Sequence, residues 1–213
     1  MSRRLPVYIL IDTSGSMKGE PIESVKVGIS DMIASLRLDP YALETACISI
    51  ITYDKEVKQI LPLTELENLQ LPDIECPDSA PTHTGAALNA LCDCYDREVN
   101  MGNREQKGDW MPLLFILTDG KPSDLMVYEE AIKNVKRHQF TNIVACAAGP
   151  KAQTEPLKKL TDNVFTLDTM DSSTFRKFFQ WVTINVQQGG RTMGVAADSV
   201  ELPPPPSEVN VVI

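Results

Sequence analysis

The stretch Val7-Tyr8-Ile9-Leu10-Ile11-Asp12-Thr13-Ser14-Gly15-Ser16-Met17 decides the fold of this chain. It begins as an apolar run without in-and-out alternation, which is typical of a strand buried on both faces in a parallel sheet covered by helices. The functional crevice of such sheets lies beyond the carboxyl ends of the strands, and Asp12, Ser14 and Ser16 follow at that end. Gly15 allows the backbone to bend so that both serine hydroxyls can face one point.

These three side chains offer only oxygen atoms to a ligand. Hard oxygen donors select Mg²⁺, Mn²⁺ or Ca²⁺ over metals that prefer softer ligands, and a site with few carboxylates suits a six-coordinate ion that keeps some waters. Serine and aspartate are also the residues that cap helices. The motif alone therefore leaves two interpretations open, a metal site and a polar turn that caps the next helix.

Length and composition describe one α/β domain with a short tail. The chain has 213 residues, of which 43% are hydrophobic and 23% charged, and no apolar run is long enough to cross a bilayer. The apolar segment after the basic start is too short for a signal peptide, so we expect a cytoplasmic protein with no membrane partner. A net charge of −9 argues against a nucleic-acid partner. The five cysteines include no C-x-x-C pair and fit reduced thiols.

Further apolar runs alternate with segments of helical spacing. Strands are expected at 45–53, 56–63, 111–117, 142–149 and 164–167. Helices are expected at 22–36, 86–95, 128–136 and 154–160, with a last helix that opens at 171. The first two of these strands are too close in sequence for a crossover helix and should form an antiparallel hairpin. The pattern predicts an α/β, doubly wound, Rossmann-like, mostly parallel six-stranded sheet with one antiparallel edge strand and helices on both faces.

The regular pattern stops near Gly189-Gly190. We therefore assign residues 1–188 to the domain and residues 189–213 to a proline-containing tail. Pro203–Pro206 should adopt extended polyproline II, and an apolar segment follows it. We expect the tail to lie over the domain surface, with a strand offered to the sheet edge of a partner as the alternative.

Two more loops carry oxygen ligands next to expected strands or helices. Thr82 stands in Pro81-Thr82-His83-Thr84-Gly85 before a helix, and Asp119 stands in Thr118-Asp119-Gly120 after a strand. By their order and types, the three motifs resemble the von Willebrand factor A (VWA) domain over about residues 5 to 188. In that family these loops form the metal-ion-dependent adhesion site (MIDAS). The chain departs from the family in having Pro81 where glycine usually precedes the threonine.

The resemblance implies that Ser14, Ser16 and Thr82 are hydroxyl ligands, with Asp12 and Asp119 binding a metal directly or through water. Thr84 is expected to cap the helix that follows it. Neutral hydroxyls and at most two carboxylates under-neutralise a divalent cation, so an Asp or Glu of a partner protein can complete its coordination shell. We expect Mg²⁺, with Mn²⁺ or Ca²⁺ as alternatives.

Within the family, the sequence is similar to the TerY type associated with bacterial tellurite resistance. This likeness rests on general similarity and on the proline-rich end. It implies partners among phosphorylation and stress-response proteins.

Enzymes are the main alternative class. A haloacid-dehalogenase-type phosphatase needs a second aspartate where this chain has Ser14. No P-loop and no nucleophile elbow occur, and of the two histidines only His83 is placed where it could line the site. We therefore expect a metal-dependent protein-interaction module and not an enzyme. The alternatives are a Mg²⁺-dependent phosphoester hydrolase that uses Asp12 and a structural subunit whose binding ignores metal.

Overall fold

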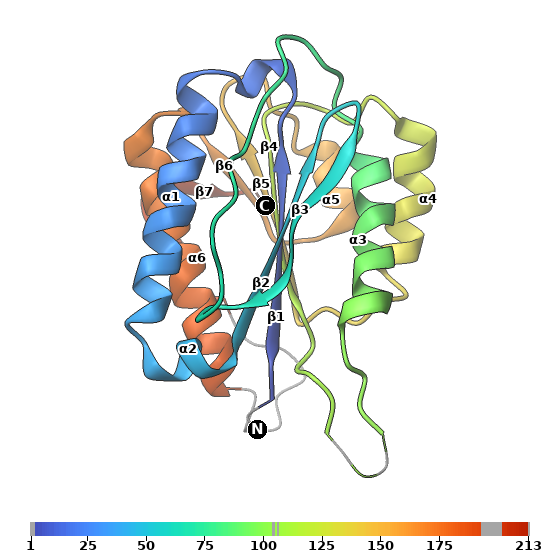
Figure 1. Ribbon diagram of the computed structural model, residues 1–213. Helices are drawn as coiled ribbons and strands as arrows, with labels where there is room; N and C mark the ends of the chain where they lie inside the picture. Colours follow the sequence, from blue (N-terminus) through green and yellow to red (C-terminus); the bar gives the residue numbers. More distant parts are fainter. Residues whose placement is uncertain (1–2, 104, 106, 193–201, 213) are drawn as a thin grey trace.

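The computed structural model describes residues 3–103, 105, 107–192 and 202–212. In this part of the chain, seven strands form one sheet in the order β3-β2-β1-β4-β5-β6-β7 (Figure 1). The strands are β1 (Leu5–Asp12), β2 (Ala46–Tyr53), β3 (Val57–Glu65), β4 (Leu113–Thr118), β5 (Asn142–Ala148), β6 (Val164–Leu167) and β7 (Val209–Val211). The helices are the 3-10 turn η1 (Gly15–Met17), α1 (Glu20–Arg37), α2 (Pro40–Thr45), α3 (Thr84–Glu98), α4 (Leu125–Val135), α5 (Glu155–Leu160) and α6 (Ser172–Thr192).

Helices cover both faces of the sheet, with α1 and α6 on one side and α3 and α4 on the other (Figure 1). All eight residues of β1 are buried. Alternate side chains of this strand enter different apolar clusters: Val7 and Ile9 pack in the cluster that contains α1 and α6, whereas Tyr8 and Leu10 pack with α3 and α4. The unbroken apolar run in the sequence is thus explained by burial on two faces.

The predicted fold class is confirmed. Strands β2, β1, β4, β5 and β6 are parallel to their neighbours in this order, and β2 and β3 form the expected antiparallel hairpin. The sheet has seven strands, not six, because β7 pairs antiparallel with β6. Both edges of the sheet therefore carry an antiparallel strand.

The extra strand comes from the tail. Pairing with β7 satisfies backbone groups of β6 that would otherwise form an open sheet edge, and Val209 is buried in the main cluster. The indole N–H of Trp181 donates to the carbonyl oxygen of Pro203 at 2.9 Å, and Lys177 forms an ion pair with Glu208. The tail residues 193–201 and 213 lie outside the described residues. The assigned boundary at residue 188 falls inside α6.

The short helix α2 was not predicted. Helix α1 ends at Arg37, shortly before Pro40. The same proline occupies the first turn of α2, where a missing N–H costs nothing. The carboxylate of Asp39 caps this helix by accepting from the amides of Tyr41 and Ala42. Among the described residues, no helix is both long and apolar enough to cross a membrane.

Candidate metal centre

The carboxylate of Asp12 lies at the end of β1 and is fully buried. One oxygen accepts from the backbone N–H of Ser14 at 2.8 Å, and the other accepts from the hydroxyl of Thr118 at 2.6 Å. Burial raises the pKa of Asp12 to about 6, although these hydrogen bonds oppose the shift; the nearby charge of Asp119 adds to it. Asp12 is therefore a carboxylate that is anchored by the protein and costly to keep ionised without a counter-charge.

The two serine hydroxyls follow in the η1 turn. Their oxygens lie 3.3 Å apart, with Ser14 buried and Ser16 exposed. Gly15 between them does not have a positive φ, and its lack of a side chain makes room for a neighbouring loop. A Cβ atom on Gly15 would lie 2.9 Å from the Cα of Ser79, so the loop before Thr82 packs directly on this glycine.

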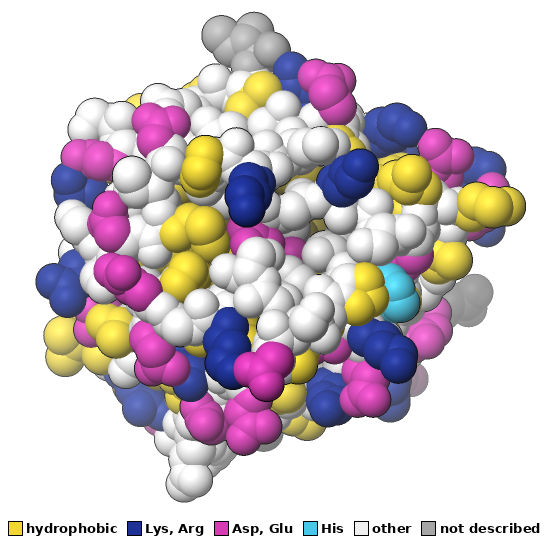
Figure 2. Space-filling model, turned by 90° about the horizontal axis from the view of Figure 1, so that it is seen from above, with side chains coloured by type: hydrophobic (Ala, Val, Ile, Leu, Met, Phe, Trp, Pro, Cys, Tyr) yellow, Lys and Arg dark blue, Asp and Glu magenta, His cyan; other side chains and the backbone are white. Residues whose placement is uncertain are grey.

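The loops that carry Asp119 and Thr82 reach the same edge of the sheet. The hydroxyl of Ser14 lies 3.5 Å from a carboxylate oxygen of Asp119. The hydroxyl oxygen of Thr82 lies 3.4 Å from the position that a Cβ on Gly120 would take. Thr82 and Asp119 are both buried, at 7% and 6% exposure. The structure thus places the five predicted ligands on adjacent loops, and Figure 2 shows acidic side chains in a recess near the centre of this face.

The structure also corrects the expected role of Thr84. This residue is the first of α3, and the residue at the N-cap position, His83, makes no side-chain capping bond. The cap comes from Asp124, whose carboxylate accepts from the backbone amides of Gly85 and Ala86. His83 lies with its Nδ1 atom 3.2 Å from the carbonyl oxygen of Lys55, in the turn between β2 and β3.

Three further residues contribute to the centre and were missed by motif reasoning. Thr118 donates to Asp12, Ser123 bonds the backbone of Thr82, and Asp124 caps α3. All three lie in or beside the segment that carries Asp119. Their only signal in the sequence was their position within or just after the motif that contains Asp119, because their hydrogen-bond partners come from other parts of the chain.

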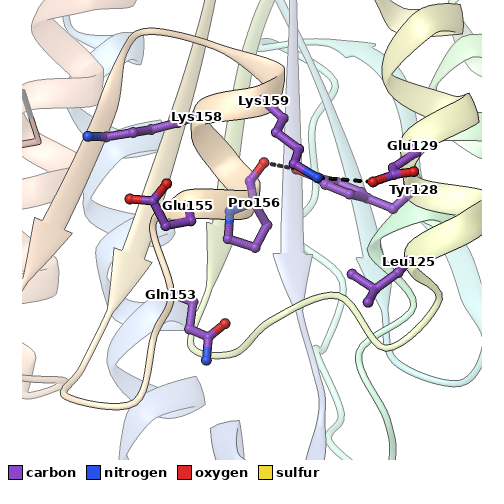
Figure 3. A pocket seen from close by; sticks show the side chains of 8 residues that line it. All are labelled: Leu125, Tyr128, Glu129, Gln153, Glu155, Pro156, Lys158 and Lys159. Atoms are coloured by element: carbon purple, nitrogen blue, oxygen red, sulfur yellow. Dashed lines mark hydrogen bonds and ion pairs between the residues drawn. The ribbon is translucent and has the colours of Figure 1, made fainter.

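A cavity of about 370 Å³ lies between α4 and α5, away from these ligands. Figure 3 shows Tyr128 and Pro156 in its lining, where the Tyr128 hydroxyl donates to the Pro156 carbonyl at 2.9 Å. Lys159 bridges to Glu129 at 3.0 Å beside them. None of the five predicted ligands lines this cavity, so it is separate from the candidate centre.

Comparison with known proteins settles the family. A family model described as the von Willebrand factor type A domain matches residues 7–181. The chain belongs to this family. The match includes all five predicted ligands of this VWA domain, from Asp12 at the end of β1 to Asp119 after β4.

Similar sequences include two matrilins. Matrilin-3 of Gallus gallus is 32% identical over 127 residues, which are 58% of this chain and 27% of that protein. Matrilin-1 of Bos taurus is 30% identical over 132 residues, which are 58% of this chain and 23% of that protein. The VWA domain thus matches only about a quarter of the length of these curated relatives.

Solved structures support the same fold. Proximal thread matrix protein 1 from the mussel byssus superposes with a TM-score of 0.67 at 16% identity, over 87% of this chain and 48% of that one. The ArnB paralog VWA2 from Sulfolobus acidocaldarius gives a TM-score of 0.58 at 16% identity, over 84% of this chain and 45% of that one. At such identity these structures establish the fold of the VWA domain and nothing beyond it.

The donor set of this VWA domain fits a hard divalent cation. All five predicted ligands offer oxygen, and only Asp12 and Asp119 carry charge. Among the described residues, no group of three or more His, Cys, Asp or Glu side chains could hold a metal. A cation at this edge would therefore depend on the hydroxyls of Ser14, Ser16 and Thr82.

Proposed function

We propose that this VWA domain is a protein-interaction module that works through a MIDAS. Asp12, Ser14, Ser16, Thr82 and Asp119 would hold Mg²⁺, with Mn²⁺ or Ca²⁺ as alternatives, and an Asp or Glu of a partner protein would complete the shell. The observation that carries the proposal is the position of the Ser14 hydroxyl. It lies 3.3 Å from the hydroxyl of Ser16 and 3.5 Å from the carboxylate of Asp119, so two loops far apart in sequence converge on one point.

The charge balance of the site supports capture of an acid. When bound, a divalent cation would offset the charge of the two carboxylates, and the three neutral hydroxyls would leave it electrophilic enough to take a further carboxylate. Asp12 stays anchored by Ser14 and Thr118, which keeps it at the rear of the centre. Ser16 is exposed and faces the solvent side from which a partner would approach. A chain of net charge −9 would otherwise repel an acidic group.

Relatives give further support. VWA domains are known as metal-dependent protein-interaction modules, and one structure of proximal thread matrix protein 1 is described with a zinc-occupied MIDAS motif. That structure covers 87% of this chain with a TM-score of 0.66 at 16% identity. By analogy, we propose that the present chain also holds a metal at this motif. The choice of Mg²⁺ follows from the hard oxygen donors.

The proposal includes a cellular setting. Similarity to the TerY type suggests a cytoplasmic role in a bacterial tellurite-resistance or stress-response system, with phosphorylation or stress-response proteins as partners. Its support is the sequence resemblance and the proline-rich segment 203–206.

The burial of Asp12 weighs against the hydrolase alternative. An attacking carboxylate needs a free oxygen that can reach the phosphorus of a substrate. Both oxygens of Asp12 accept hydrogen bonds, and the side chain is 0% exposed. This geometry suits an anchor and not a nucleophile.

Calorimetry and thermal unfolding with Mg²⁺, Mn²⁺, Ca²⁺ or Zn²⁺ test the metal site. At a metal concentration one hundred times Kd, binding should stabilise the wild type by about 2.7 kcal/mol and raise Tm by roughly 5–10 °C. Asp12→Ala combined with Asp119→Ala should abolish the shift. The matched control removes two exposed carboxylates elsewhere, Asp93→Ala with Asp162→Ala, and should keep it. Equal binding by wild type and the Asp12/Asp119 variant would overturn the site.

The partner half of the proposal needs a separate measurement. Proteins captured by the wild type from host extract should elute with EDTA and should not be captured by the Asp12/Asp119 variant. If EDTA does not release the captured proteins and the Asp12/Asp119 variant captures them as well as the wild type does, metal-dependent binding is contradicted.

A further inference from the structure

The two loops that carry Thr82 and Asp119 are joined by a pair of adjacent residues. Ser123 donates its backbone N–H to the carbonyl oxygen of Thr82 at 2.8 Å, and its hydroxyl accepts from the N–H of Thr82 at 3.1 Å. Asp124 accepts from the amides of Gly85 and Ala86 at 3.1 and 2.9 Å. We call this set of four hydrogen bonds the Ser123–Asp124 clamp.

Ser123 controls the orientation of the Thr82 backbone. It satisfies both the N–H and the carbonyl group of Thr82, so the peptide units on either side of that residue are held from one direction. The Cα–Cβ bond follows the backbone, which aims the Thr82 hydroxyl towards Gly120, the residue next to Asp119. Because Thr82 is 7% exposed, its N–H cannot exchange this partner for water without a cost.

Asp124 serves the neighbouring helix and not its own. It stands at the N-cap position of α4 but makes no side-chain bond to that helix. Its carboxylate instead receives two of the free N–H groups at the start of α3, where the helix dipole favours negative charge. Gly85, the first of those donors, also lies against the backbone of Tyr128 in α4. The starts of α3 and α4 are therefore fastened together.

The loops that carry Thr82 and Asp119 contact the loop after β1 through hydrogen bonds between side chains, whereas every bond of the clamp involves a backbone group. Thr118 donates to Asp12 at 2.6 Å, and the hydroxyl of Ser14 approaches Asp119 at 3.5 Å, which is at the limit of a hydrogen bond. The proposed ligands thus fall into two groups, Asp12 with the two serines and Thr82 with Asp119. The clamp lies wholly within the second group.

We infer that the Ser123–Asp124 clamp positions Thr82 relative to Asp119, with the Ser123 hydroxyl acting as a positioning residue for the Thr82 ligand. The inference rests on the proposed function. Pro81, the residue before Thr82, has no N–H to donate, and the Thr82 backbone is held by its two hydrogen bonds to Ser123. Thr82 is consequently oriented from across the site.

An isosteric pair at position 123 tests the inference. Ser123 is exposed, so either β-branched side chain can be accommodated. Ser123→Thr keeps the hydroxyl and should bind Mg²⁺ within about twofold of wild type, whereas Ser123→Val loses it and should weaken binding about five- to tenfold. Ser123→Ala gives the same comparison if valine disturbs folding. Calorimetry reports Kd, and Tm in EDTA reports the stability of each variant without metal.

A double-mutant cycle separates positioning from general damage. If Ser123 acts through Thr82, then adding Ser123→Val to Thr82→Ala should weaken Mg²⁺ binding no further. Full additivity of the two changes would overturn the inference, as would equal Kd values for the threonine and valine variants at position 123. Those results leave metal binding by the wild type intact and so spare the proposed function. A wild type that binds none of the divalent cations overturns the proposed function and the inference together.

Discussion

Replacing Gly85 with alanine should loosen the junction of α3 and α4 that supports the candidate centre. Gly85 is the second residue of α3 and is buried. A Cβ atom built on it would lie 2.3 Å from the backbone nitrogen of Tyr128 and 2.7 Å from its Cα. Both atoms belong to the backbone of α4, which cannot move aside by changing rotamer as a flexible side chain could.

The size of the effect follows from two opposing contributions. Alanine is favoured over glycine inside a helix by up to about 1 kcal/mol. Overpacking commonly costs about 1–3 kcal/mol, and a contact with rigid helix backbone belongs at or above the upper end. We expect Gly85→Ala to reduce the free energy of unfolding by about 2 kcal/mol and Tm by roughly 4–8 °C. Metal affinity should also fall, because the Gly85 amide is held by Asp124.

Gly189 provides the matched control. It also lies in a helix, α6, but a Cβ there would meet only the ends of two leucine side chains, at 3.4 and 3.6 Å. Gly189→Ala should therefore keep or raise stability, by up to about 1 kcal/mol. Urea unfolding followed by circular dichroism, in EDTA, compares the two variants. The reasoning is refuted if Gly85→Ala is as stable as the wild type or as Gly189→Ala.

Two further predictions concern the tail and the thiols. Removing residues 202–213 should lower the free energy of unfolding by about 1–3 kcal/mol and increase self-association at high concentration, because β6 then becomes an open edge; unchanged Tm and unchanged light scattering would contradict this. Cys76 is half-buried, and burial together with the nearby charge of Asp12 raises its pKa to about 11. Its reaction with DTNB at pH 8 should be about one hundred times slower than that of a free cysteine and should accelerate as pH rises towards 11; a rate equal to that of free cysteine would show the thiolate to be unhindered.

Much of the fold was predictable because its central strands are buried on both faces. Such strands have no exposed side, so β1 and β4 stand out in the sequence as apolar runs, and β2 is apolar except for Ser49 and Thr52. The edges were less predictable. The three residues of β7 are too short to be distinctive by themselves, and only Val209 is buried. Their pairing depends on β6, which is more than forty residues away in the chain.

The candidate centre divides in the same way. Asp12, Ser14, Ser16, Thr82 and Asp119 could be selected because each stands in a short motif with a chemical rationale. The groups that orient these side chains could not be selected from the sequence. Thr118 was visible only as a neighbour of Asp119, since nothing in the sequence shows that its hydroxyl would reach Asp12.

Strand order explains why these motifs meet at all. Strand β1 is flanked by β2 on one side and by β4 on the other, with Ile11 opposite Leu117 in the β1–β4 register. The next residue of each strand is then Asp12 and Thr118, which accounts for their hydrogen bond.

The chain leaves β1 through α1, which covers one face of the sheet, and leaves β4 through α4, which covers the opposite face (Figure 1). Loops that depart in opposite directions from adjacent strands open a crevice between them, as at the switch point of other doubly wound sheets. Figure 2 looks onto this end of the molecule and shows acidic side chains in a recess near its centre. The Ser123–Asp124 clamp then supplies what strand order cannot, because Thr82 precedes a helix and has no strand of its own to hold it beside Asp119.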